Sequence, residues 1–557
     1  MRVLGVEGTA WCASAAVFDA ETDSVFIESD AYEPDSGGIH PREAAEHMGE
    51  AIPRVIEVAL DHAREASDDR DADEPPVDAV AFSRGPGLGP CLRIVATAAR
   101  ALARTLDVPL VGVNHMVAHL EIGRHRAGFD SPVCLNASGA NAHLLGYHDG
   151  RYRVLGETMD TGVGNALDKF TRHVGWSHPG GPKIEEHAKR GEFVDLPYVV
   201  KGMDFSFSGI MSAAKAAYDD GVPVEDVCFS LQEHVFAMLT EVSERALSLT
   251  GTDELVLGGG VGQNARLREM LAEMCAERGA DFHAPEPRFL RDNAGMIAVL
   301  GAKMAAAGDT VAVEDSAIDA DFRPDQVPVT WRGDGESVAR TPGGADDAAA
   351  LRGAEATVSV DGDAVRKRRP PKGYRHPALD ETLRRERTVA EARLLASARR
   401  AGVPTPLVYD VDVAEATITM QRVGERDLAA ALSADRARTV GEHLARLHGE
   451  GIVHGDPTTR NVRVGGGAGG STRGRGDGPA ADDGADPPLF LIDFGLGFNS
   501  DHVEDYAMDL HVFEQSVEGT ASDAGSLVDA VEEGYRAVGD PAVLERLRGV
   551  EGRGRYQ

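Results

Sequence analysis

The chain has 557 residues, which is too many for one ordinary domain and predicts about three or four domains. Its 91 acidic residues outnumber its 57 lysines and arginines, so the formal net charge is −34. This balance excludes a protein that coats nucleic acid or a membrane surface over its whole area. Only eight of the basic residues are lysines. We attribute this bias and the acid excess to adaptation to high salt, with drift in a GC-rich genome as the alternative.

The five cysteines are scattered and form no CxxC pair, which excludes a disulfide framework and a four-thiolate zinc site. The N-terminus has no secretion-signal pattern, and no apolar run approaches the roughly 18 residues of a membrane span. We therefore expect a soluble, cytoplasmic protein with no membrane partner.

Two polar, glycine-rich stretches divide the chain. Residues 326–350 predict a linker, and residues 465–488 predict a disordered insertion within a hairpin, because such a composition cannot form a core. We expect one α/β region at 1–325 and a smaller α+β region at 351–557.

A pattern repeats inside the first region. Residues 3–9 run into the apolar segment Ala13–Phe18, and residues 133–141 run into His143–Tyr147. Each copy is typical of a strand, a turn of small residues and a second strand. Predicted helices follow each copy, at Arg42–Arg64 and Ala96–Leu106, then at Ile184–Arg190 and Gln232–Leu249. The repeat predicts two similar lobes with a cleft between them.

His115 and His119 are four residues apart, which places both imidazoles on one face of a helix. Met116 and Val117 stand where the glutamate of a zinc-protease HExxH motif would be, so that motif is absent. Asp292, just before a glycine-containing helix, is the candidate third ligand. Two histidines and one carboxylate favour iron(II), or zinc. An ordinary pair of helix histidines is the alternative.

Glycine-rich turns indicate nucleotide contacts. The apolar strand Leu255–Gly258 leads into the turn 258–264 and a predicted helix at Ala265–Glu277, where backbone N–H groups can approach a phosphate. Ser138-Gly139 predicts a second phosphate-facing turn, and Asp168 is a candidate acceptor for ribose hydroxyls. Tight turns without a ligand and a helix-starting aspartate are the alternatives.

The second region holds the pattern H-x-D-x-x-x-x-N at 454–461, behind a predicted helix at Val440–Leu447. Asp493-Phe494-Gly495 follows the predicted strand Leu489–Ile492. In a phosphotransferase the aspartate of the first pattern, here Asp456, orients the attacking hydroxyl or water. Asn461 and Asp493 hold Mg²⁺ on the phosphates of ATP.

A lysine–glutamate pair completes this kinase-type pattern. Lys367 is the candidate phosphate-pairing lysine. Its predicted partner on the helix Leu383–Arg400 is Glu391, with Glu386 as the alternative.

Nine ordered segments of the first region carry a resemblance, among them VLGVEGTA, NHMVAHLE, SGAN and RFLRDNAGMIA. The segments are residues 3–10, 83–93, 114–121, 138–141, 162–170, 178–186, 205–210, 258–271 and 288–298. Residues 1–325 thereby resemble the universal tRNA threonylcarbamoyltransferase family, the catalytic subunit of the archaeal and eukaryotic KEOPS complex. The resemblance implies the two-lobed actin/Hsp70/sugar-kinase (ASKHA) fold.

The resemblance also implies roles for single residues. His115, His119 and Asp292 match the family's iron ligands. The implied adenylate contacts are Asp168, Gly181, Glu185 and Asn264, and the implied phosphate loop is Asn136, Ala137, Ser138, Gly139 and Ala140. The family usually has a tyrosine ligand where this chain has Asn136, so Asn136 is a further metal candidate and the metal's identity is open.

The implied reaction is acyl transfer. The threonylcarbamoyl group of threonylcarbamoyl-AMP passes to N6 of adenosine 37 in tRNAs that read ANN codons, and AMP leaves. No side chain identifies itself as the general base. No synthase motif is visible, so a separate enzyme must supply the adenylate.

Residues 350–557 resemble the small atypical kinase of the same complex, through segments at 352–358, 369–395, 454–461 and 492–497. Gly353, Ala354, Glu355 and Ala356 replace the usual glycine-rich loop, and no A-P-E motif follows Asp493. The resemblance implies a Mg²⁺-ATP site that serves as an ATPase or a regulatory Ser/Thr kinase. It also implies two small accessory subunits, one dimerising and one kinase-binding.

Residues 352–400 carry 13 lysines and arginines against seven acids, a local net charge of about +6 that suits tRNA phosphates. The arginines after Leu544 add to this charge. Paired surface charges or an acidic partner are the alternatives. The competing functions are a signalling kinase with an inert actin-like domain, a metalloprotease, and a binder of apurinic DNA.

Overall fold

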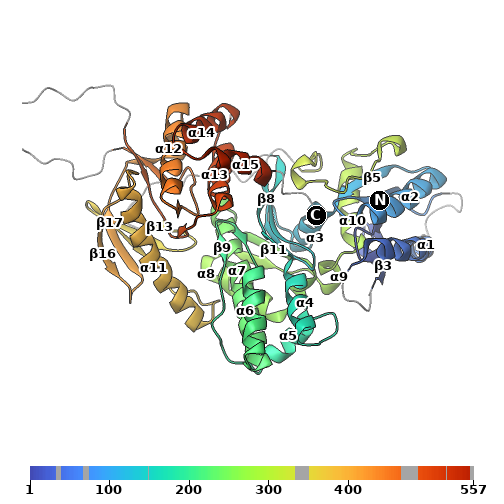
Figure 1. Ribbon diagram of the computed structural model, residues 1–557. Coiled ribbons are helices and arrows are strands. Elements are labelled where there is room, and N and C mark those ends of the chain that lie inside the picture. Colours follow the sequence, from blue (N-terminus) through green and yellow to red (C-terminus); the bar gives the residue numbers. More distant parts are fainter. Residues whose placement is uncertain are drawn as a thin grey trace, which may run out of the picture. The chain divides into compact units, whose positions relative to one another are not determined.

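The computed structural model describes residues 1–32, 39–66, 74–148, 150–332, 351–465, 487–521 and 524–551. The chain forms two compact units (Figure 1). The described residues up to Arg332, with Gly373–Arg375, belong to the first unit, and the other residues from Leu351 onward belong to the second. Most of the predicted linker and of the predicted insertion lies outside the described residues.

The first unit contains two five-stranded sheets with the same strand order. The first runs β3-β2-β1-β4-β5 and the second β8-β7-β6-β11-β12. In each, the first three strands in the chain pair antiparallel, and the two later strands join parallel. The first sheet consists of β1 (Arg2–Glu7), β2 (Cys12–Asp19), β3 (Ser24–Ala31), β4 (Ala79–Gly85) and β5 (Leu110–Asn114). The second consists of β6 (Val133–Ala137), β7 (Ala142–His148), β8 (Arg151–Glu157), β11 (Glu254–Gly258) and β12 (Asp281–His283). The repeat in the sequence is therefore a repeat in the structure.

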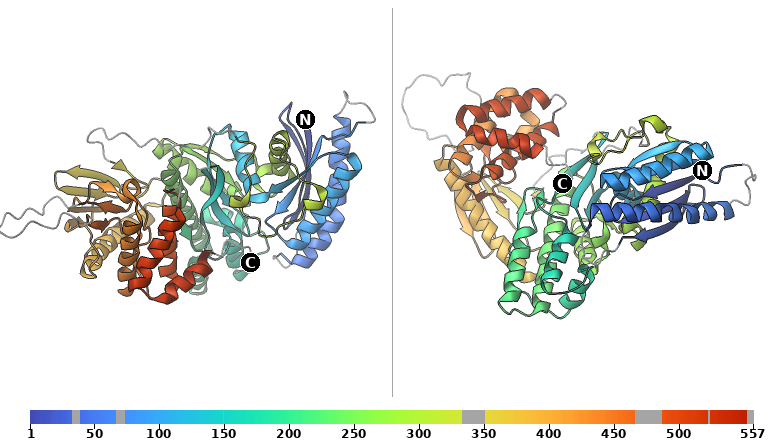
Figure 2. Two further views of the ribbon diagram at one scale, coloured as in Figure 1. Left: turned by 90° about the horizontal axis from the view of Figure 1, so that it is seen from above. Right: turned by 45° about the vertical axis from the view of Figure 1, so that its right-hand side comes forward.

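Helices cover both faces of each sheet. Helices α1 (Pro41–Glu65) and α2 (Gly89–Leu106) pack on the outer face of the first sheet. Helices α3 (His115–Ala127) and α10 (Ala294–Ala306) lie between the two sheets, in one core with apolar side chains of both (Figure 2). The outer face of the second sheet carries α4 (Val163–His173), α5 (Gly181–Ala188), α6 (Ser208–Asp219), α7 (Val224–Thr250) and α8 (Ala265–Arg278).

The second unit begins with an antiparallel sheet of order β13-β14-β15-β17-β16 and a long helix, α11 (Pro377–Arg400). The strands are β13 (Leu351–Arg352), β14 (Thr357–Asp361), β15 (Ala364–Arg368), β16 (Val408–Asp412) and β17 (Thr417–Gln421). A helical part follows, with α12 (Ala434–Gly449), α13 (Val503–Glu518), α14 (Ala524–Val538) and α15 (Pro541–Glu551). Short strands lie among these helices: β18 (Arg426–Asp427), β19 (Ile452–Val453), β20 (Val462–Val464), β21 (Leu489–Leu491) and β22 (Phe498–Asn499). One core joins the two parts.

The predicted helices are present, and several start earlier than the apolar pattern indicates. Helix α2 begins at Gly89, because Pro90 in its first turn already has the φ angle of a helix. The first residues of the predicted linker pack on the first unit, and Arg332 forms an ion pair with the buried Glu121. No helix in the described part of the chain is long and apolar enough to cross a membrane.

Candidate metal centre and kinase-type site

The metal candidates lie at the N-terminal end of α3. Asn114 caps this helix, since its side-chain oxygen accepts hydrogen bonds from the backbone N–H groups of Met116 and Val117 at 3.0 and 3.1 Å. The cap starts the helix at His115, so His119 lies one turn further on the same face.

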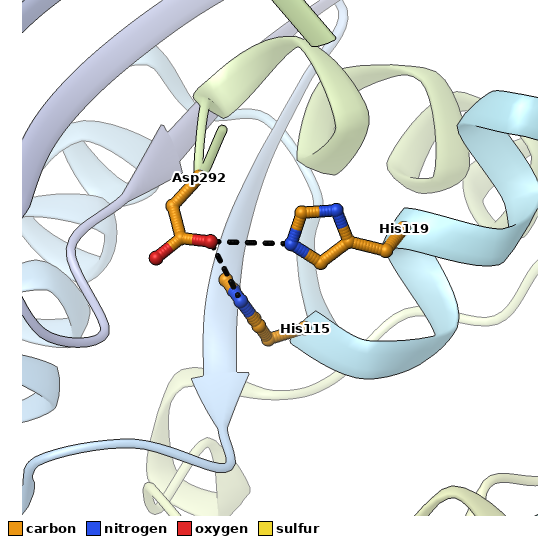
Figure 3. Close-up of side chains that lie close together, drawn as sticks. All are labelled: His115, His119 and Asp292. Atoms are coloured by element: carbon orange, nitrogen blue, oxygen red, sulfur yellow. Dashed lines mark hydrogen bonds and ion pairs between the residues drawn. The ribbon is translucent and has the colours of Figure 1, made fainter. Parts of the chain in front are cut away.

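Asp292 meets both histidines from the segment between α9 (Pro287–Leu290) and α10 (Figure 3). Its Oδ1 lies 3.2 Å from Nε2 of His119 and 3.4 Å from Nε2 of His115. The three candidate ligand atoms lie within 4.8 Å of one another, as binding to one ion requires. The structure thus brings together the three residues that the sequence proposes.

Residues of β1 and the following turn orient this cluster. Oε2 of Glu7 lies 3.1 Å from Nδ1 of His115, and Thr9 donates two hydrogen bonds to Oε1 of Glu7. Trp11 donates from Nε1 to Oδ2 of Asp292 at 3.0 Å. Such outer partners fix the ring and carboxylate orientations of metal ligands. The sequence assigns no role to Glu7 or Trp11; the available signal is an acidic residue at the end of the apolar strand at residues 3–7.

The cluster requires positive charge. Burial alone would lower the pKa of His115, but Glu7 and Asp292 outweigh it and raise that pKa to about 10. Burial lowers the pKa of His119, and the charge of His115 lowers it further. Burial would raise the pKa of Asp292, yet the two histidines hold it below its usual range. A cation that displaces the proton of His115 would satisfy the same carboxylates.

Buried polar atoms without partners adjoin the cluster. They are Nδ1 of His119, Oδ1 of Asn136 and both ring nitrogens of His143. Asn136 and His143 are cross-strand neighbours on β6 and β7. A Cβ built on Gly258 would lie 3.5 Å from Oδ1 of Asn136 and 3.7 Å from Cβ of His119. The side chains of Asn136 and His119 therefore border the same glycine. Two imidazoles, one carboxylate and these unused groups fit a divalent transition metal.

The predicted adenylate contacts fall into two pairs linked by α5. Oδ1 of Asp168, on α4, accepts a hydrogen bond from the N–H of Gly180, next to Gly181, where α5 begins. Glu185, further along α5, accepts from the N–H of Ala265 at the start of α8. Asn264 caps α8 and also donates to Gln232.

The turn at 138–140 packs on the start of α4. The carbonyls of Ser138 and Gly139 accept hydrogen bonds from the N–H groups of Gly164 and Asn165. A Cβ on Gly164 would come within 2.7 Å of Cα of Gly139, so only glycine permits this approach. The turn follows Asn136 and Ala137, which end β6, and it adjoins the helix that carries Asp168.

In the second unit, Lys367 donates to Oε1 of Glu391 at 2.8 Å and to Oδ1 of Asp493 at 2.5 Å. Glu386 is exposed, so Glu391 is the glutamate that the structure brings to the lysine. Asp493 has a positive φ of 64°, an uncommon conformation for a non-glycine residue that is enriched at functional sites. Lys367 holds the pKa of Asp493 below its usual range, and Asp493 holds the pKa of Lys367 above its usual range. Both shifts oppose the effect of burial.

Asn461 donates from Nδ2 to Oδ2 of Asp456 at 3.0 Å, so the predicted Mg²⁺ ligand and the predicted orienting aspartate are in contact. The residues that replace the glycine-rich loop, Gly353 to Ala356, form the turn between β13 and β14. Lys372 donates to the carbonyl of Ala354, and Arg387 pairs with Glu355. This turn is thus held by two cations.

Comparison with known proteins first gives the class of the first unit. Residues 22–299 match the family described as tRNA N6-adenosine threonylcarbamoyltransferase. Among solved structures, HypF of T. kodakarensis is 14% identical with a TM-score of 0.40, over 56% of this chain and 49% of that one, which is too low to argue from.

Full-length relatives then give the particular family. A probable bifunctional tRNA threonylcarbamoyladenosine biosynthesis protein of Halobacterium salinarum is 70% identical over 100% of this chain and 99% of its own. Proteins of the same name from Haloarcula marismortui and Methanospirillum hungatei are 66% and 49% identical over 100% of this chain and 100% and 99% of their own. The chain belongs to the family of bifunctional tRNA threonylcarbamoyladenosine biosynthesis proteins. The resemblance found in the sequence is thereby confirmed, and with it the class of enzyme that the sequence predicts.

Proposed function

We propose that the first unit transfers the threonylcarbamoyl group of threonylcarbamoyl-AMP to N6 of adenosine 37 in ANN-decoding tRNAs. The C–O bond to the AMP phosphate breaks, the bond from N6 to the carbamoyl carbon forms, and N6 loses a proton. The observation that carries the proposal is the cluster of His115, His119 and Asp292 in a chain of this family. The matching strand orders of the two sheets support the ASKHA type of fold.

His115, His119 and Asp292 would hold iron(II), or zinc in its place. The bound ion would supply Lewis-acid polarisation of the reacting carbonyl. Glu7 and Trp11 keep the ligand atoms aimed at one point through their hydrogen bonds to His115 and Asp292. Asn136 is a further candidate ligand, because its buried side-chain oxygen has no partner.

The adenylate would lie against α4, α5 and α8. Asp168 would accept ribose hydroxyls, and Glu185 and Asn264 would hold the nucleotide from the other end of α5. Gly181 would permit close approach, since a Cβ there would meet no atom within 4 Å. The exposed backbone of Gly139 and Ala140 would face the leaving phosphate.

The second unit would bind Mg²⁺-ATP and act as an ATPase coupled to tRNA modification, with regulatory Ser/Thr phosphorylation as its second role. Lys367 would pair with phosphates, Asn461 and Asp493 would hold Mg²⁺, and Asp456 would orient the attacking water or hydroxyl. The contact between Asn461 and Asp456 supports this assignment. The unit would span 351–557, after a transferase at 1–325 and a linker at 326–350.

The exposed arginines of the basic stretch 352–400 would contact tRNA phosphates. Four of its cations, Lys367, Arg369, Lys372 and Arg375, are buried and take no part. Two small KEOPS subunits, one dimerising and one kinase-binding, would complete the complex, and a separate synthase would supply threonylcarbamoyl-AMP.

The test uses the full chain at high salt with threonylcarbamoyl-AMP, the accessory subunits and an ANN-decoding tRNA. Mass spectrometry of the digested tRNA reports the modified nucleoside. We expect product with the wild type, none with His119→Ala, and reduced turnover with Asp456→Ala. Unchanged product with His119→Ala would rule out the metal-centred assignment. No product in any sample would favour a signalling kinase with an inert actin-like unit.

A further inference from the structure

Arg369, directly after β15, is a buried arginine that has no part in the proposed ATP site. Its relative exposure is 2%, and it is among the largest fully buried side chains. Its backbone N–H donates to the carbonyl of Ala416, which extends the pairing of β15 with β17 by one step. Burial of a guanidinium is unfavourable, so such a residue is retained only with strong partners.

The partners of Arg369 both lie on α11. Nη2 donates to Oε2 of Glu391 at 2.5 Å, and Nη1 lies 3.3 Å from Oγ1 of Thr388. Thr388 and Glu391 are three residues apart, so they share one face of the helix. The planar fork of the guanidinium therefore spans one helical turn and fixes the rotation of α11 about its axis.

Glu391 is held by two cations at once. Oε1 accepts from Lys367 at 2.8 Å, while Oε2 accepts from Arg369. Lys367 also contacts Asp493, whose side chain is 44% exposed, whereas that of Glu391 is fully buried. Glu391 thus belongs to the fixed half of the cluster, and Asp493 to the half that solvent and ligands reach.

The chain leaves little room for external control of this pair. Only residues 496–502 separate Gly495 from α13, and β22 within them pairs with β19. In protein kinases, the activation segment and the position of the equivalent helix decide whether the lysine–glutamate pair forms. A link of this length holds no such segment.

We propose that Arg369 is a positioning residue that takes over this task, by clamping Glu391 so that Lys367 is aligned for phosphates without phosphorylation of the chain. The inference rests on the proposed ATP site. With Mg²⁺-ATP bound, Asp493 would hold Mg²⁺ in place of Lys367, and Lys367 would pair with the phosphates. Arg369 keeps the buried Glu391 neutralised throughout that exchange.

Two variants and a matched control test the clamp in the full-length protein at high salt without tRNA. Arg369→Gln removes the charge and the fork, and Arg369→Lys keeps only the charge. Arg368→Gln is the control, because the Arg368 side chain is 55% exposed and its ion pair among the described residues is with the exposed Glu415 at 3.5 Å. We expect Arg369→Gln to lower kcat of ATP hydrolysis about tenfold or more with less than about threefold change in KM, as for a group that aligns rather than binds. Arg369→Lys should have the melting temperature of the wild type but the low kcat of Arg369→Gln.

A double-mutant cycle separates positioning from general stability. If Arg369 acts through Glu391, Arg369→Gln will reduce kcat further by less than about twofold in a Glu391→Gln background. Additive losses, or wild-type kcat in Arg369→Gln, would overturn the proposal.

A second readout does not depend on hydrolysis. Labelling of Lys367 by an amine-selective reagent, followed by peptide mass spectrometry, should be about tenfold faster in Arg369→Gln than in the wild type or Arg368→Gln, since a buried paired amine reacts slowly. Unchanged labelling in Arg369→Gln would overturn the clamp. Absence of ATP hydrolysis in wild type and control would instead overturn the proposed ATPase role, and the labelling would still decide on the clamp.

Discussion

The two buried clusters of charged and polar groups differ in how far the protein itself satisfies them. In the second unit, Lys367 and Arg369 face Glu391 and Asp493, so cations and carboxylates balance, and of these four side chains only Arg369 keeps a buried atom, Nε, without a hydrogen-bond partner in the described part of the chain. In the first unit, one carboxylate oxygen of Asp292 meets Nε2 of both histidines, and Oδ1 of the neighbouring Asn136 has no hydrogen-bond partner among the described residues.

The difference follows from what each site must do. A site for a resident cation requires ligand atoms left unused in the protein, and the buried Oδ1 of Asn136 and the ring nitrogens of His143 have no partners among the described residues. A site for a nucleotide that enters and leaves has to be stable without it, because unpaired buried charges are costly. The metal candidates would therefore gain a cation as a partner when the metal binds, whereas Asp493 would exchange one cation, Lys367, for another when the nucleotide binds.

The strongest test of this distinction removes one charged group from each cluster. Asp292→Asn should lower metal affinity more than 100-fold, since even outer partners of ligands are worth about 10–100-fold. Lys367→Met should abolish ATP hydrolysis and leave the metal content unchanged. Elemental analysis of dialysed protein, together with phosphate release, measures both. Full metal content in Asp292→Asn would break the comparison.

A balanced network also lies in the first unit, on the same helix as the metal candidates. Glu121 is fully buried and accepts from the hydroxyl of Tyr152 and from Lys303, with Arg124 and Arg332 as further partners. Glu121→Gln should lower the free energy of unfolding by about 3–5 kcal/mol, because it leaves buried cations without a counter-charge. Chemical denaturation measures the loss. The exposed Glu46, paired with Arg42, is the control, and Glu46→Gln should change stability by less than about 0.5 kcal/mol.

The pKa of Glu121 predicts how the stability of the protein depends on pH. Burial would raise its pKa, but Lys303 and Arg124, with Tyr152 and Arg332, lower it to about 2. The folded state therefore binds this proton less readily than the unfolded state. The stabilisation is present above the ordinary pKa of about 4.5 and is lost as pH falls through about 2. It amounts to about 3 kcal/mol. The free energy of unfolding, measured by denaturation at several pH values between 6 and 3, should change less steeply with pH in Glu121→Gln than in the wild type. Identical slopes would contradict the assignment.

The sequence alone predicts the parts of both sites that follow from spacing. Two histidines four apart on a helix, and the order of HxDxxxxN and DFG, constrain side chains through local geometry. The repeated strand pattern predicts the two lobes for the same reason. Glu391 could be proposed because it lies on a predicted helix at a suitable distance from Lys367.

Contacts between distant segments are not predictable in this way. The contact of Trp11 with Asp292 joins residues 281 positions apart, and that of Glu7 with His115 joins residues 108 apart. Arg369 stands among four consecutive basic residues, and nothing in their order shows which one turns inward. Packing of β15 against α11 decides it, and packing is a tertiary property.

Trp11 provides a smaller test of the metal cluster. Trp11→Phe keeps the aromatic ring but removes the hydrogen bond from Nε1 to Oδ2 of Asp292. We expect about tenfold weaker metal binding with an unchanged metal-to-protein ratio at saturation. Titration of the metal-free protein measures the affinity. Trp176→Phe is the control, because Trp176 stacks on His187 away from the cluster. Equal affinity in all three proteins would show that Asp292 is held without Trp11.

The last prediction concerns Asp204, a carboxyl group with no cation beside it in the described part of the chain, in contrast to Glu121. Burial raises the pKa of Asp204 to about 7. The negative charge of Glu157 adds to this rise, while the hydrogen bond from the backbone N–H of Glu157 opposes it. Because the folded state keeps this proton while the unfolded state releases it near pH 4, stability falls as pH rises from about 4 to 7.

Asp204→Asn should remove that fall. The amide oxygen can still accept the hydrogen bond from the N–H of Glu157, which the carboxylate accepts at 2.9 Å. Since Asp204 is only partly buried, we expect the variant to be more stable than the wild type by about 1–2 kcal/mol at pH 8 and equal to it at pH 4. Denaturation at both pH values measures this. A destabilised variant at pH 8 would mean that the ionised carboxylate has a partner in the folded protein. Asp204 would then belong with the balanced groups.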